Sequence, residues 1–493
     1  MPTELMAELS PLPILDAFEA FRGRFIDLDD GRIVDHAELA RGRESLVHRL
    51  RGRGLASGDR VVIAITNGAQ FVAALTSVLA CDASPLLLHW QTPPAELKRT
   101  ACRFGARFII SDNSEHEALQ ALGITTTDLA IEPWLTLIWA ELDDSDPAFQ
   151  PADSSICGVP LHPTSGSTGL PKVALRPGPR AVAEADHYIE TMAITADDTI
   201  LAVPPMSHAY GYGTCAMVPL VSGASVVSIK RFSVKRVEKA LQEYPITVLP
   251  TVPATLDVLS FGSYANMYDR LRWVLTAGSL LTERTAADFK KRTGVTACAL
   301  YGTTETGGIS VATSLDGSHV GGRVGPPMNG VGARVSPPDA AEGLQEGLGR
   351  LWIRSSSMMV GYLGDNGQIT SPFVDDWFQT GDLAKIDDDG TINLRGRESE
   401  MINVCGMKVV PAEVEDVLAT LPDVKEVKVY SGTLKSGSQI VKAAIVPNNG
   451  LDVAQVRAHC EQHLIYYKRP QVINLLDALP RSPTGKILRD QLP

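Results

Sequence analysis

Short apolar segments alternate with helix-like segments through the first two-thirds of the chain. Residues 60–65 form a β-branched run, residues 70–79 suit a helix, and residues 107–111 form another buried strand. Such alternation is typical of α/β folds with largely parallel sheets. Because 44% of the 493 residues are hydrophobic and only 21% are charged, the chain can bury a large core, and we expect more than one domain.

The pattern changes in the last third of the chain. From Gly349 onward, short extended segments are separated by tight turns such as Asp387–Gly390, which is a hairpin signal and indicates a small β-rich unit. After Arg397 the pattern becomes α+β and includes a helix over residues 411–421, which begins at proline and is rich in glutamate in its first turn. We therefore place a domain boundary at residues 397–400.

Charge and composition exclude several classes of function. Because the chain contains 45 Lys and Arg but 57 Asp and Glu, its net charge is −12, and we expect no nucleic-acid partner. The start, Met1–Leu5, lacks the pattern of a signal peptide, and the apolar window 71–90 is interrupted by Asp82 and Pro85, so we expect no export and no membrane span. The seven scattered cysteines include no Cys-x-x-Cys pair, which predicts reduced thiols and a cytoplasmic protein.

A run of hydroxyl side chains and glycines, Thr164–Lys172, ends in a lysine. Glycines let the backbone approach phosphate oxygens, hydroxyls and amides donate hydrogen bonds, and the lysine adds a point charge. The run lacks the Gly-Lys-Ser/Thr ending of a P-loop NTPase, and a flexible linker would not need its closing Leu-Pro-Lys. We therefore predict a polyphosphate site. Its residues are Thr164, Ser165, Gly166, Ser167, Thr168, Gly169 and Lys172.

A second polar segment, Tyr301–Gly307, packs an aromatic ring, hydroxyls and one carboxylate into a single turn. Such a turn can stack a base, touch a phosphate and hold a magnesium ion. Taken alone, the segment is better interpreted as an ordinary polar turn with a solvated glutamate. Its interpretation depends on three further segments, which are Gln379–Asp382, Gly396–Arg397 and Pro483–Lys486.

Together these segments resemble the adenylate-forming superfamily, which includes acyl- and aryl-CoA ligases, peptide-synthetase adenylation domains and luciferase-like enzymes. The resemblance covers almost the whole chain in the family's motif order, including Gly349–Ile353 and Gly361–Leu363, and is closest to the acyl- and aryl-CoA ligases. It implies an α/β fold with a large ATP- and acid-binding domain over residues 1–396, built from two α/β sheets and a small β-barrel. A hinge at residues 397–400 would lead to a small, mobile α+β lid domain over residues 401–493.

The resemblance implies a role for each matching residue. The Thr164–Lys172 run would hold the β- and γ-phosphates of ATP, Tyr301 would lie against adenine, Thr304 would meet the α-phosphate, and Glu305 would hold Mg²⁺. Asp382 would accept from the ribose hydroxyls, and Arg397 would reach the ribose and a phosphate. The remaining ATP-binding positions are Gly278, Ser279, Gly302 and Thr303.

Catalysis would depend on Lys486, together with Thr304 and Glu305. Lys486 matches the family's lysine that bridges the substrate carboxylate and the α-phosphate, where fixed positive charge lowers the barrier. A solvated lysine near the chain end is the alternative, but the surrounding Pro-Arg-Ser-Pro-Thr-Gly and Ile-Leu-Arg favour the catalytic role.

The segment 204–213 bears on the acid substrate. Relatives that activate amino acids usually carry an aspartate here, whereas this chain has Met, Ser and His, so an ammonium group would lack its countercharge. We expect an aryl or a short- to medium-chain acyl acid, with His208 near its carboxylate and Tyr210 or Tyr212 near its body, although a buried structural role for His208 is an equal alternative. Ala277 and Gly278 would line the same pocket.

The acceptor is expected to be the thiol of coenzyme A. The block ending at Lys486 and the segment 406–415 resemble CoA ligases, and Gly406 and Lys408 would lie in the thiol-acceptor region. The hinge residue is Ser399, where relatives commonly carry Asp or Lys, so the domain rotation between the two half-reactions could differ. The alternatives are a phosphopantetheine thiol on an acyl carrier protein, an amine acceptor, or a nucleotide-binding scaffold without turnover. The sequence does not indicate an oligomeric state.

Overall fold

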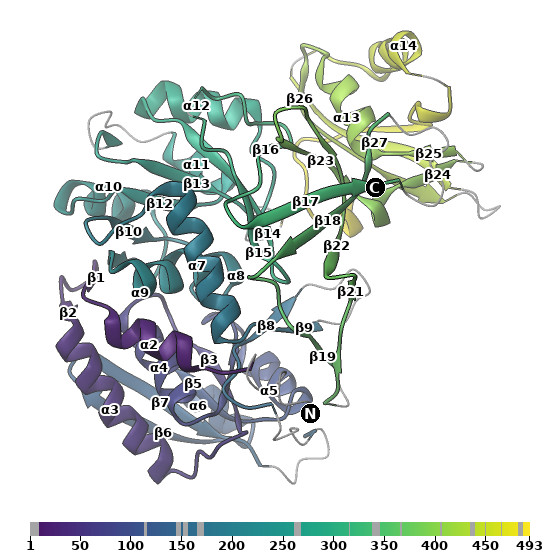
Figure 1. The fold of residues 1–493 in the computed structure, drawn as a ribbon. Helices are drawn as coiled ribbons and strands as arrows, with labels where there is room; N and C mark the ends of the chain where they lie inside the picture. The colour runs from purple at the N-terminus through teal and green to yellow at the C-terminus, as the bar shows by residue number, and fades with distance from the viewer. Residues whose placement is uncertain are drawn as a thin grey trace. The chain divides into compact units, whose positions relative to one another are not determined.

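The computed structural model confirms a mixed α/β fold with several sheets (Figure 1). It separates into two compact units, which are described one at a time. Unit 1 comprises residues 1–320, 327–332 and 354–376, and unit 2 comprises residues 321–326, 333–353 and 377–493. The structure describes residues 9–112, 116–143, 149–150, 156–164, 172–260, 268–314, 316–337, 346–364, 367–404, 407–433, 439–448, 450–464, 466–481 and 487–493.

A nine-stranded sheet forms one half of unit 1. Its centre is parallel, because β3 pairs with β4 and β5 and β4 pairs with β8, whereas the outer pairs are antiparallel. The predicted strands at 60–65 and 107–111 are β3 and β5, and the predicted helix is α4 (Ala69–Ala80). In spatial order the strands are β20 (Ile369–Thr370), β19 (Gly361–Leu363), β9 (Lys172–Leu175), β8 (Leu161–Thr164), β4 (Ser84–Leu87), β3 (Arg60–Ala64), β5 (Ala106–Ser111), β7 (Leu135–Glu141) and β6 (Thr125–Glu132).

An eight-stranded sheet forms the other half of unit 1. It is parallel from β14 through β1 and ends in an antiparallel strand on each side. In spatial order its strands are β15 (Gly307–Val311), β14 (Ala297–Thr303), β13 (Trp273–Thr276), β12 (Val248–Thr251), β10 (Thr199–Ala202), β11 (Ser225–Ser228), β1 (Arg24–Asp27) and β2 (Ile33–Asp35).

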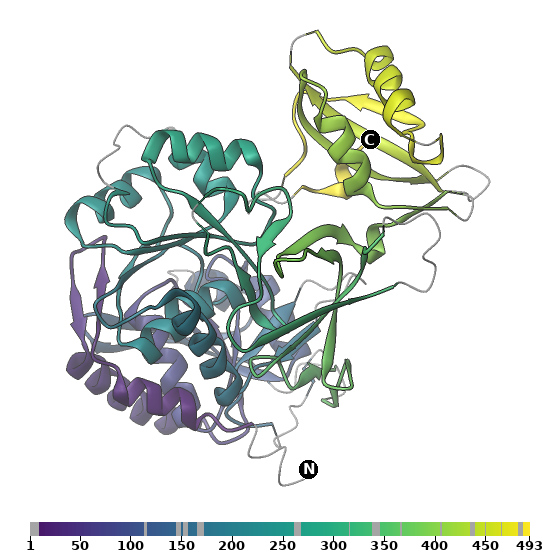
Figure 2. The ribbon, with the colours of Figure 1, turned by 45° about the horizontal axis from the view of Figure 1, so that its top comes forward.

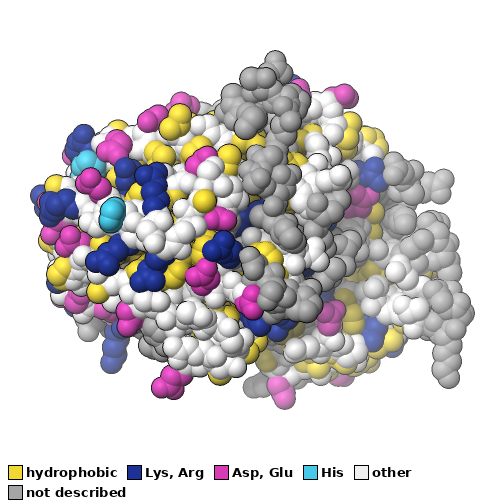
Figure 3. Space-filling model, turned by 90° about the horizontal axis from the view of Figure 1, so that it is seen from below, with side chains coloured by type: hydrophobic (Ala, Val, Ile, Leu, Met, Phe, Trp, Pro, Cys, Tyr) yellow, Lys and Arg dark blue, Asp and Glu magenta, His cyan; other side chains and the backbone are white. Residues whose placement is uncertain are grey.

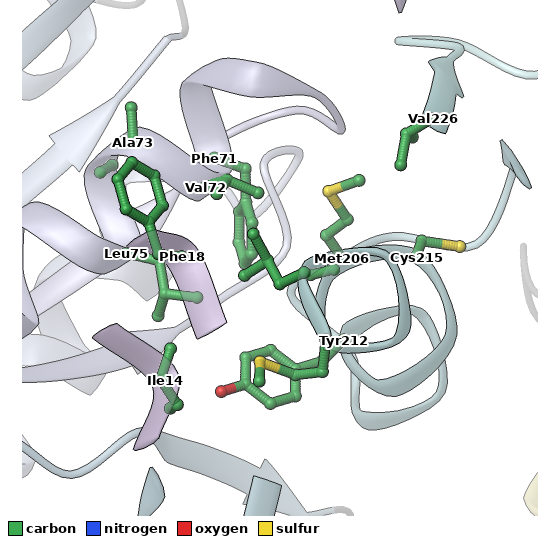
Figure 4. Close-up of a cluster of buried hydrophobic side chains, with 14 of the residues drawn as sticks. Ile14, Phe18, Phe71, Val72, Ala73, Leu75, Met206, Tyr212, Cys215 and Val226 are labelled. Carbon is green, nitrogen blue, oxygen red and sulfur yellow. The ribbon is translucent and has the colours of Figure 1, made fainter. Parts of the chain in front are cut away.

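The largest hydrophobic cluster joins the two sheets of unit 1. It contains Ile63 of β3 and Ile200 of β10, and the helices α2 (Leu12–Ala20), α4 and α7 (Gly178–Met192) contribute side chains between them (Figure 1). Figure 4 shows how Phe18 and Tyr212 lie within this core. The other helices of unit 1 are α3 (His36–Gly52), α5 (Pro94–Arg103), α6 (His116–Ala121), α8 (Ala209–Gly211), the π-helix η1 (Tyr212–Met217), α9 (Val218–Ser222), α10 (Val234–Glu243), α11 (Pro253–Leu259) and α12 (Glu283–Thr293).

Unit 2 contains the β-rich part that the sequence predicted after Gly349. An antiparallel sheet has the order β16-β23-β22-β18-β17, and the pairings of the described residues do not close it into a barrel. The predicted hairpin at 387–390 joins β22 to β23, and Gly390 has the left-handed φ of 82° that such a turn requires. The strands are β16 (Arg323–Gly325), β17 (Val331–Ser336), β18 (Gly349–Ser355), β22 (Trp377–Ile386) and β23 (Ile392–Arg397), whereas β21 (Phe373–Val374) belongs to unit 1.

The end of unit 2 is α+β, as predicted. The helices α13 (Pro411–Ala419) and α14 (Val453–His463) pack against a three-stranded sheet, and side chains of all these elements form one hydrophobic cluster (Figure 2). The strands are β26 (Val424–Thr433), β27 (Gln439–Pro447) and β28 (Val472–Leu475), with a separate pair β24 (Ile402–Val404) and β25 (Met407–Val409) and the 3₁₀ turns η3 (Glu398–Glu400), η4 (Tyr466–Lys468) and η5 (Arg489–Gln491).

The surface is charged on the face seen from below, where lysine and arginine side chains lie among aspartates and glutamates (Figure 3). Arg43 forms an ion pair with Glu19 at 3.0 Å. Within the described residues, no helix is both long enough and apolar enough to cross a bilayer. The predicted hinge at residues 397–400 concerns motion and stays a prediction.

The packing of α2 yields a stability prediction. Phe18 is 0% exposed in the core, whereas Leu12 on the same helix is 60% exposed. Phe18→Ala should therefore lower the free energy of unfolding by about 3–5 kcal/mol, because it removes buried apolar surface and leaves a cavity. Leu12→Ala is the matched control and should change the free energy of unfolding by less than about 0.5 kcal/mol. Urea unfolding followed by tryptophan fluorescence measures both, and equal effects of the two variants would contradict the described core.

Candidate active site

The turn over residues 301–307 is the tip of a hairpin between β14 and β15. Gly302 pairs with Gly308 and Thr303 with Gly307, so residues 304–306 form the loop. The backbone nitrogen of Thr306 donates to Thr303 Oγ1 at 3.2 Å, and Gly307 has a φ of 72°, which favours glycine. The sequence motif is therefore a defined reverse turn that presents Thr304 and Glu305.

A tyrosine outside the predicted site orients the carboxylate of this turn. The hydroxyl of Tyr362, on β19, donates to Glu305 Oε1 at 2.8 Å, and Lys172 Nζ lies 4.9 Å from the centre of the Tyr362 ring. The backbone is held as well, because Met359 N donates to the Glu305 carbonyl at 2.8 Å. Lys172 and Glu305, which belong to separate predicted motifs, thus both contact one side chain.

This arrangement fits a magnesium site that needs phosphate ligands. Among the residues that the structure describes, no group of three His, Cys, Asp or Glu is placed to hold a metal. Mg²⁺ is usually held by one or two carboxylates together with substrate phosphates, so the single carboxylate of Glu305 beside Lys172 suits an ion that arrives with ATP.

The ends of the hydroxyl-rich run lie side by side in the nine-stranded sheet. Thr164, the last residue of β8, pairs directly with Lys172, the first residue of β9. Residues 165–171 lie outside the described residues, so the predicted phosphate contacts of Ser165, Gly166, Ser167, Thr168 and Gly169 stay predictions.

A cavity of about 460 Å³ lies within unit 1. It is bordered both by the turn over residues 301–307, which is predicted to bind nucleotide (the nucleotide turn), and by the segment 204–213, which is predicted to bind the acid (the acid-binding segment). Gly302–Thr304 line one part of it, and His208 and Tyr210 line another. Ala277–Gly278, directly after β13, also border it. Ligand pockets commonly have volumes of about 300–1,000 Å³, so this cavity is large enough for a small molecule.

The two tyrosines of the acid-binding segment have different positions. Tyr210 borders the cavity, and its hydroxyl accepts from Thr251 N at 3.2 Å and donates to the Leu275 carbonyl at 3.3 Å. Tyr212 is fully buried in the hydrophobic core (Figure 4). Three predicted site residues that the structure describes do not line the cavity: Tyr301, Glu305 and Ser279.

Three histidines border the cavity, and their surroundings favour the neutral form. Burial lowers the pKa of His89 to about 4, with the nearby charge of His208 as a second cause. The rings of these two histidines stack with centres 5.6 Å apart. His208 is exposed toward the cavity, but the enclosing protein still lowers its pKa. Complete burial lowers the pKa of His162 well below its usual value, with Arg176 as the next cause.

Sequence reasoning missed a buried ion pair under the nucleotide turn. Arg176 Nη2 donates to Glu184 Oε2, and the two side chains are 0% and 1% exposed. Gly308 N donates to the other oxygen of Glu184 at 3.1 Å. A Cβ added at Gly307 would lie 2.7 Å from Glu184 Cδ, so the turn rests directly on the pair. The available signal was a glutamate between alanines 181 and 185, on the apolar face of what the structure shows as α7.

This ion pair also affects which substrate charges the cavity can accommodate. Glu184 borders the cavity, so the pocket does contain a carboxylate. However, Arg176 already neutralises Glu184, and Glu96, the other carboxylate on the described lining, is exposed, so the buried part of the cavity offers an ammonium group no free countercharge.

In unit 2, the predicted ribose-binding residues lie opposite each other. Asp382 on β22 pairs with Arg397 on β23, and Arg397 Nε lies 2.7 Å from Asp382 Oδ1. Ser399 is exposed. Both neighbouring glutamates contact arginines: Glu398 accepts a hydrogen bond from Arg350 at 2.8 Å, and Glu400 forms an ion pair with Arg489.

The predicted catalytic lysine, Lys486, and the acceptor residue Gly406 lie outside the described residues. The backbone of Lys408 belongs to β25, where it pairs with Asn403. The roles of these residues stay predictions.

Similarity to known proteins extends over most of the chain. The family model of the AMP-binding enzymes matches residues 18–363, and that of the AMP-binding enzyme C-terminal domain matches residues 413–486. The chain is 28% identical to the indoleacetate–CoA ligase of Aromatoleum aromaticum and 28% identical to the sulfoacetate–CoA ligase of Cupriavidus necator, in each case over 94% of this chain and 93% of the relative. ATP-bound MatB from Rhodopseudomonas palustris has the same fold, with a TM-score of 0.81, 22% identity and 98% of each chain covered.

The buried ion pair yields a prediction about stability. Glu184→Ala leaves the Arg176 charge buried without a partner and should lower the free energy of unfolding by about 3–5 kcal/mol. The double variant Arg176→Met/Glu184→Leu removes both charges and should recover most of this loss. Thermal unfolding by calorimetry compares the three proteins. If the double variant were as unstable as Glu184→Ala, an unpaired charge would not be the cause.

Proposed function

The chain belongs to the AMP-binding enzyme family, in its acyl- and aryl-CoA ligase branch, and from this premise we propose that it activates a carboxylic acid with ATP and transfers the acyl group to coenzyme A. One observation carries the proposal: a single cavity is bordered by both the nucleotide turn and the acid-binding segment. A small acid in that cavity would lie beside the α-phosphate that Thr304 is predicted to contact.

In the first half-reaction, a carboxylate oxygen of the acid attacks the α-phosphorus of ATP. An oxygen–phosphorus bond forms, the bond to the bridging oxygen breaks, and pyrophosphate leaves with the bonding electrons. Negative charge builds between two anionic groups, so fixed donors aimed at this position lower the barrier. Thr304 supplies a hydroxyl at the cavity, and Lys486 is proposed to supply the positive charge.

Glu305 would hold the magnesium ion, whose chemical contribution is to neutralise the departing pyrophosphate. The hydrogen bond from Tyr362 fixes the orientation of this carboxylate and leaves its other oxygen for the ion. Lys172, whose Nζ lies 4.9 Å from the centre of the Tyr362 ring, would contact the β- and γ-phosphates.

In the second half-reaction, the thiol sulfur attacks the carbonyl carbon of the acyl-adenylate. A carbon–sulfur bond forms, the thiol proton is lost, and AMP leaves as the oxygen–carbon bond breaks. We propose free coenzyme A as the acceptor and residues 397–400 as the hinge between the domains 1–396 and 401–493, with Gly406 and Lys408 near the incoming thiol. If the acceptor were instead a phosphopantetheine thiol on a carrier protein, or an amine, only this second half-reaction would differ.

We place this reaction in the cytoplasm. Six described cysteines are free thiols, and five of them are buried, which suits a reducing compartment.

A panel of acids tests the proposed reaction. Aromatic and medium-chain acids should each be assayed for pyrophosphate release with and without coenzyme A, and the products identified by mass spectrometry. We expect acid-dependent release, faster turnover with coenzyme A, and an acyl-CoA product. Parallel arms with a holo carrier protein or an amine identify a different acceptor. Nucleotide binding without turnover for any acid would instead favour the scaffold.

The proposed lysine can be tested in the same assay. Lys486→Ala should lower acid-dependent pyrophosphate release by at least about 100-fold, because it removes a charge that acts in the transition state. Lys425, an exposed lysine on β26, provides the matched control, and Lys425→Ala should retain the wild-type rate. A wild-type rate for Lys486→Ala would show that this lysine is not part of the mechanism.

A further inference from the structure

One part of the cavity wall is polar and deeply buried, and it was not predicted from the sequence. His162, on β8, borders the cavity while being only 1% exposed. Glu184, on α7, borders it as well, and Arg176 lies behind Glu184 as its partner. We call these three residues the buried polar cluster.

His162 has unused hydrogen-bonding capacity. Neither of its ring nitrogens has a partner among the described residues, and its edge-on contact with the Tyr212 ring, with centres 4.7 Å apart, satisfies neither nitrogen. An unsatisfied buried polar group is destabilising, because no hydrogen bond offsets the loss of its contacts with water. Because His162 borders the cavity, a group on a bound molecule can supply the missing partner.

The charge of the cluster limits which groups fit. Glu184, rather than Arg176, borders the cavity, so a second carboxylate on the acid would meet a carboxylate first. At the buried polar cluster, a cationic group would meet a carboxylate that Arg176 already neutralises, and the other carboxylate on the described lining, Glu96, is exposed and lies outside this cluster. A purely apolar acid would leave His162 unsatisfied.

A neutral hydrogen-bond donor meets all of these conditions. Each oxygen of Glu184 uses one lone pair, toward Arg176 or Gly308, and can accept again. A neutral imidazole both donates and accepts, and burial holds the pKa of His162 well below its usual value, so the ring stays neutral at pH 7.

We propose that the preferred acid carries, apart from its reacting carboxylate, an uncharged hydroxyl or ring N–H group that hydrogen-bonds to the buried polar cluster. This inference rests on the proposed function and narrows it to hydroxylated or N-heteroaromatic acids. His162 and Glu184 are then specificity-determining residues of the acid pocket.

A matched series of acids tests the proposal on the wild-type enzyme. Benzoate, phenylacetate and cinnamate should each be compared with their 4-hydroxy, 4-carboxy and 4-aminomethyl derivatives, and indole-3-acetate with its N-methyl derivative. We expect the best hydroxyl or N–H acid to exceed its donor-free counterpart by at least about 10-fold in kcat/KM for pyrophosphate release, corresponding to one hydrogen bond of about 1.4 kcal/mol. A preference for carboxylate, aminomethyl or donor-free acids would overturn the proposal.

Variants of His162 separate recognition from stability. His162→Phe keeps a ring against Tyr212 but removes both nitrogens, so the preference should fall below about 2-fold while the melting temperature does not fall. His162→Gln keeps a donor and an acceptor and should retain part of the preference. His48→Phe, at an exposed position on α3, is the control and should retain the full preference.

The outcomes distinguish this inference from the proposed function. If acids are activated but His162→Phe keeps the wild-type preference, the buried polar cluster does not recognise the acid, although the enzyme is still a ligase. If His162→Phe does not fold, the acid preference of the wild-type enzyme alone decides whether the proposal holds. If no acid supports pyrophosphate release, the proposed function and this inference both fail.

Discussion

Glu184 accepts hydrogen bonds from Arg176 and from the backbone nitrogen of Gly308, and all of these groups are buried. Arg176 directly follows β9, which begins where the hydroxyl-rich run ends, and Gly308 belongs to the strand that follows the nucleotide turn. A buried ion pair tolerates little displacement, because separating the charges in a low dielectric is costly. The pair therefore fixes β9, α7 and the turn relative to one another.

This constraint also shapes the chemistry of the cavity. The positive charge of Arg176 is used within the protein, and burial lowers the pKa of His89 and His162, so the buried part of the predicted acid pocket offers hydrogen bonds without net charge. The residues predicted to serve the β- and γ-phosphates and Mg²⁺, Lys172 and Glu305, are not on the cavity lining, whereas Thr304, predicted to meet the α-phosphate, is. Separate environments for the acid's body and for the phosphates allow one protein to accept different acids with the same reaction at phosphorus.

The sequence predicted those features that depend on local patterns. The β3 and β5 strands and the α4 helix follow from runs of apolar residues, and the turn at 387–390 follows from its aspartates and glycine. Contacts between distant segments could not be predicted this way. Tyr362 meets Glu305 because β19 joins β9 at the sheet edge, and His162 borders the cavity only through the packing of two sheets. The sequence motifs thus identified chemical groups but not their neighbours.

The central claim is that a carboxylate oxygen of the acid attacks the α-phosphorus of ATP in this cavity. The most direct measurement uses an acid labelled with ¹⁸O in both carboxylate oxygens and follows the label by mass spectrometry through one complete turnover with coenzyme A. Attack at the α-phosphorus predicts that AMP carries one ¹⁸O atom and that pyrophosphate carries none. Unlabelled AMP, or formation of ADP and a labelled phosphate, would contradict the account.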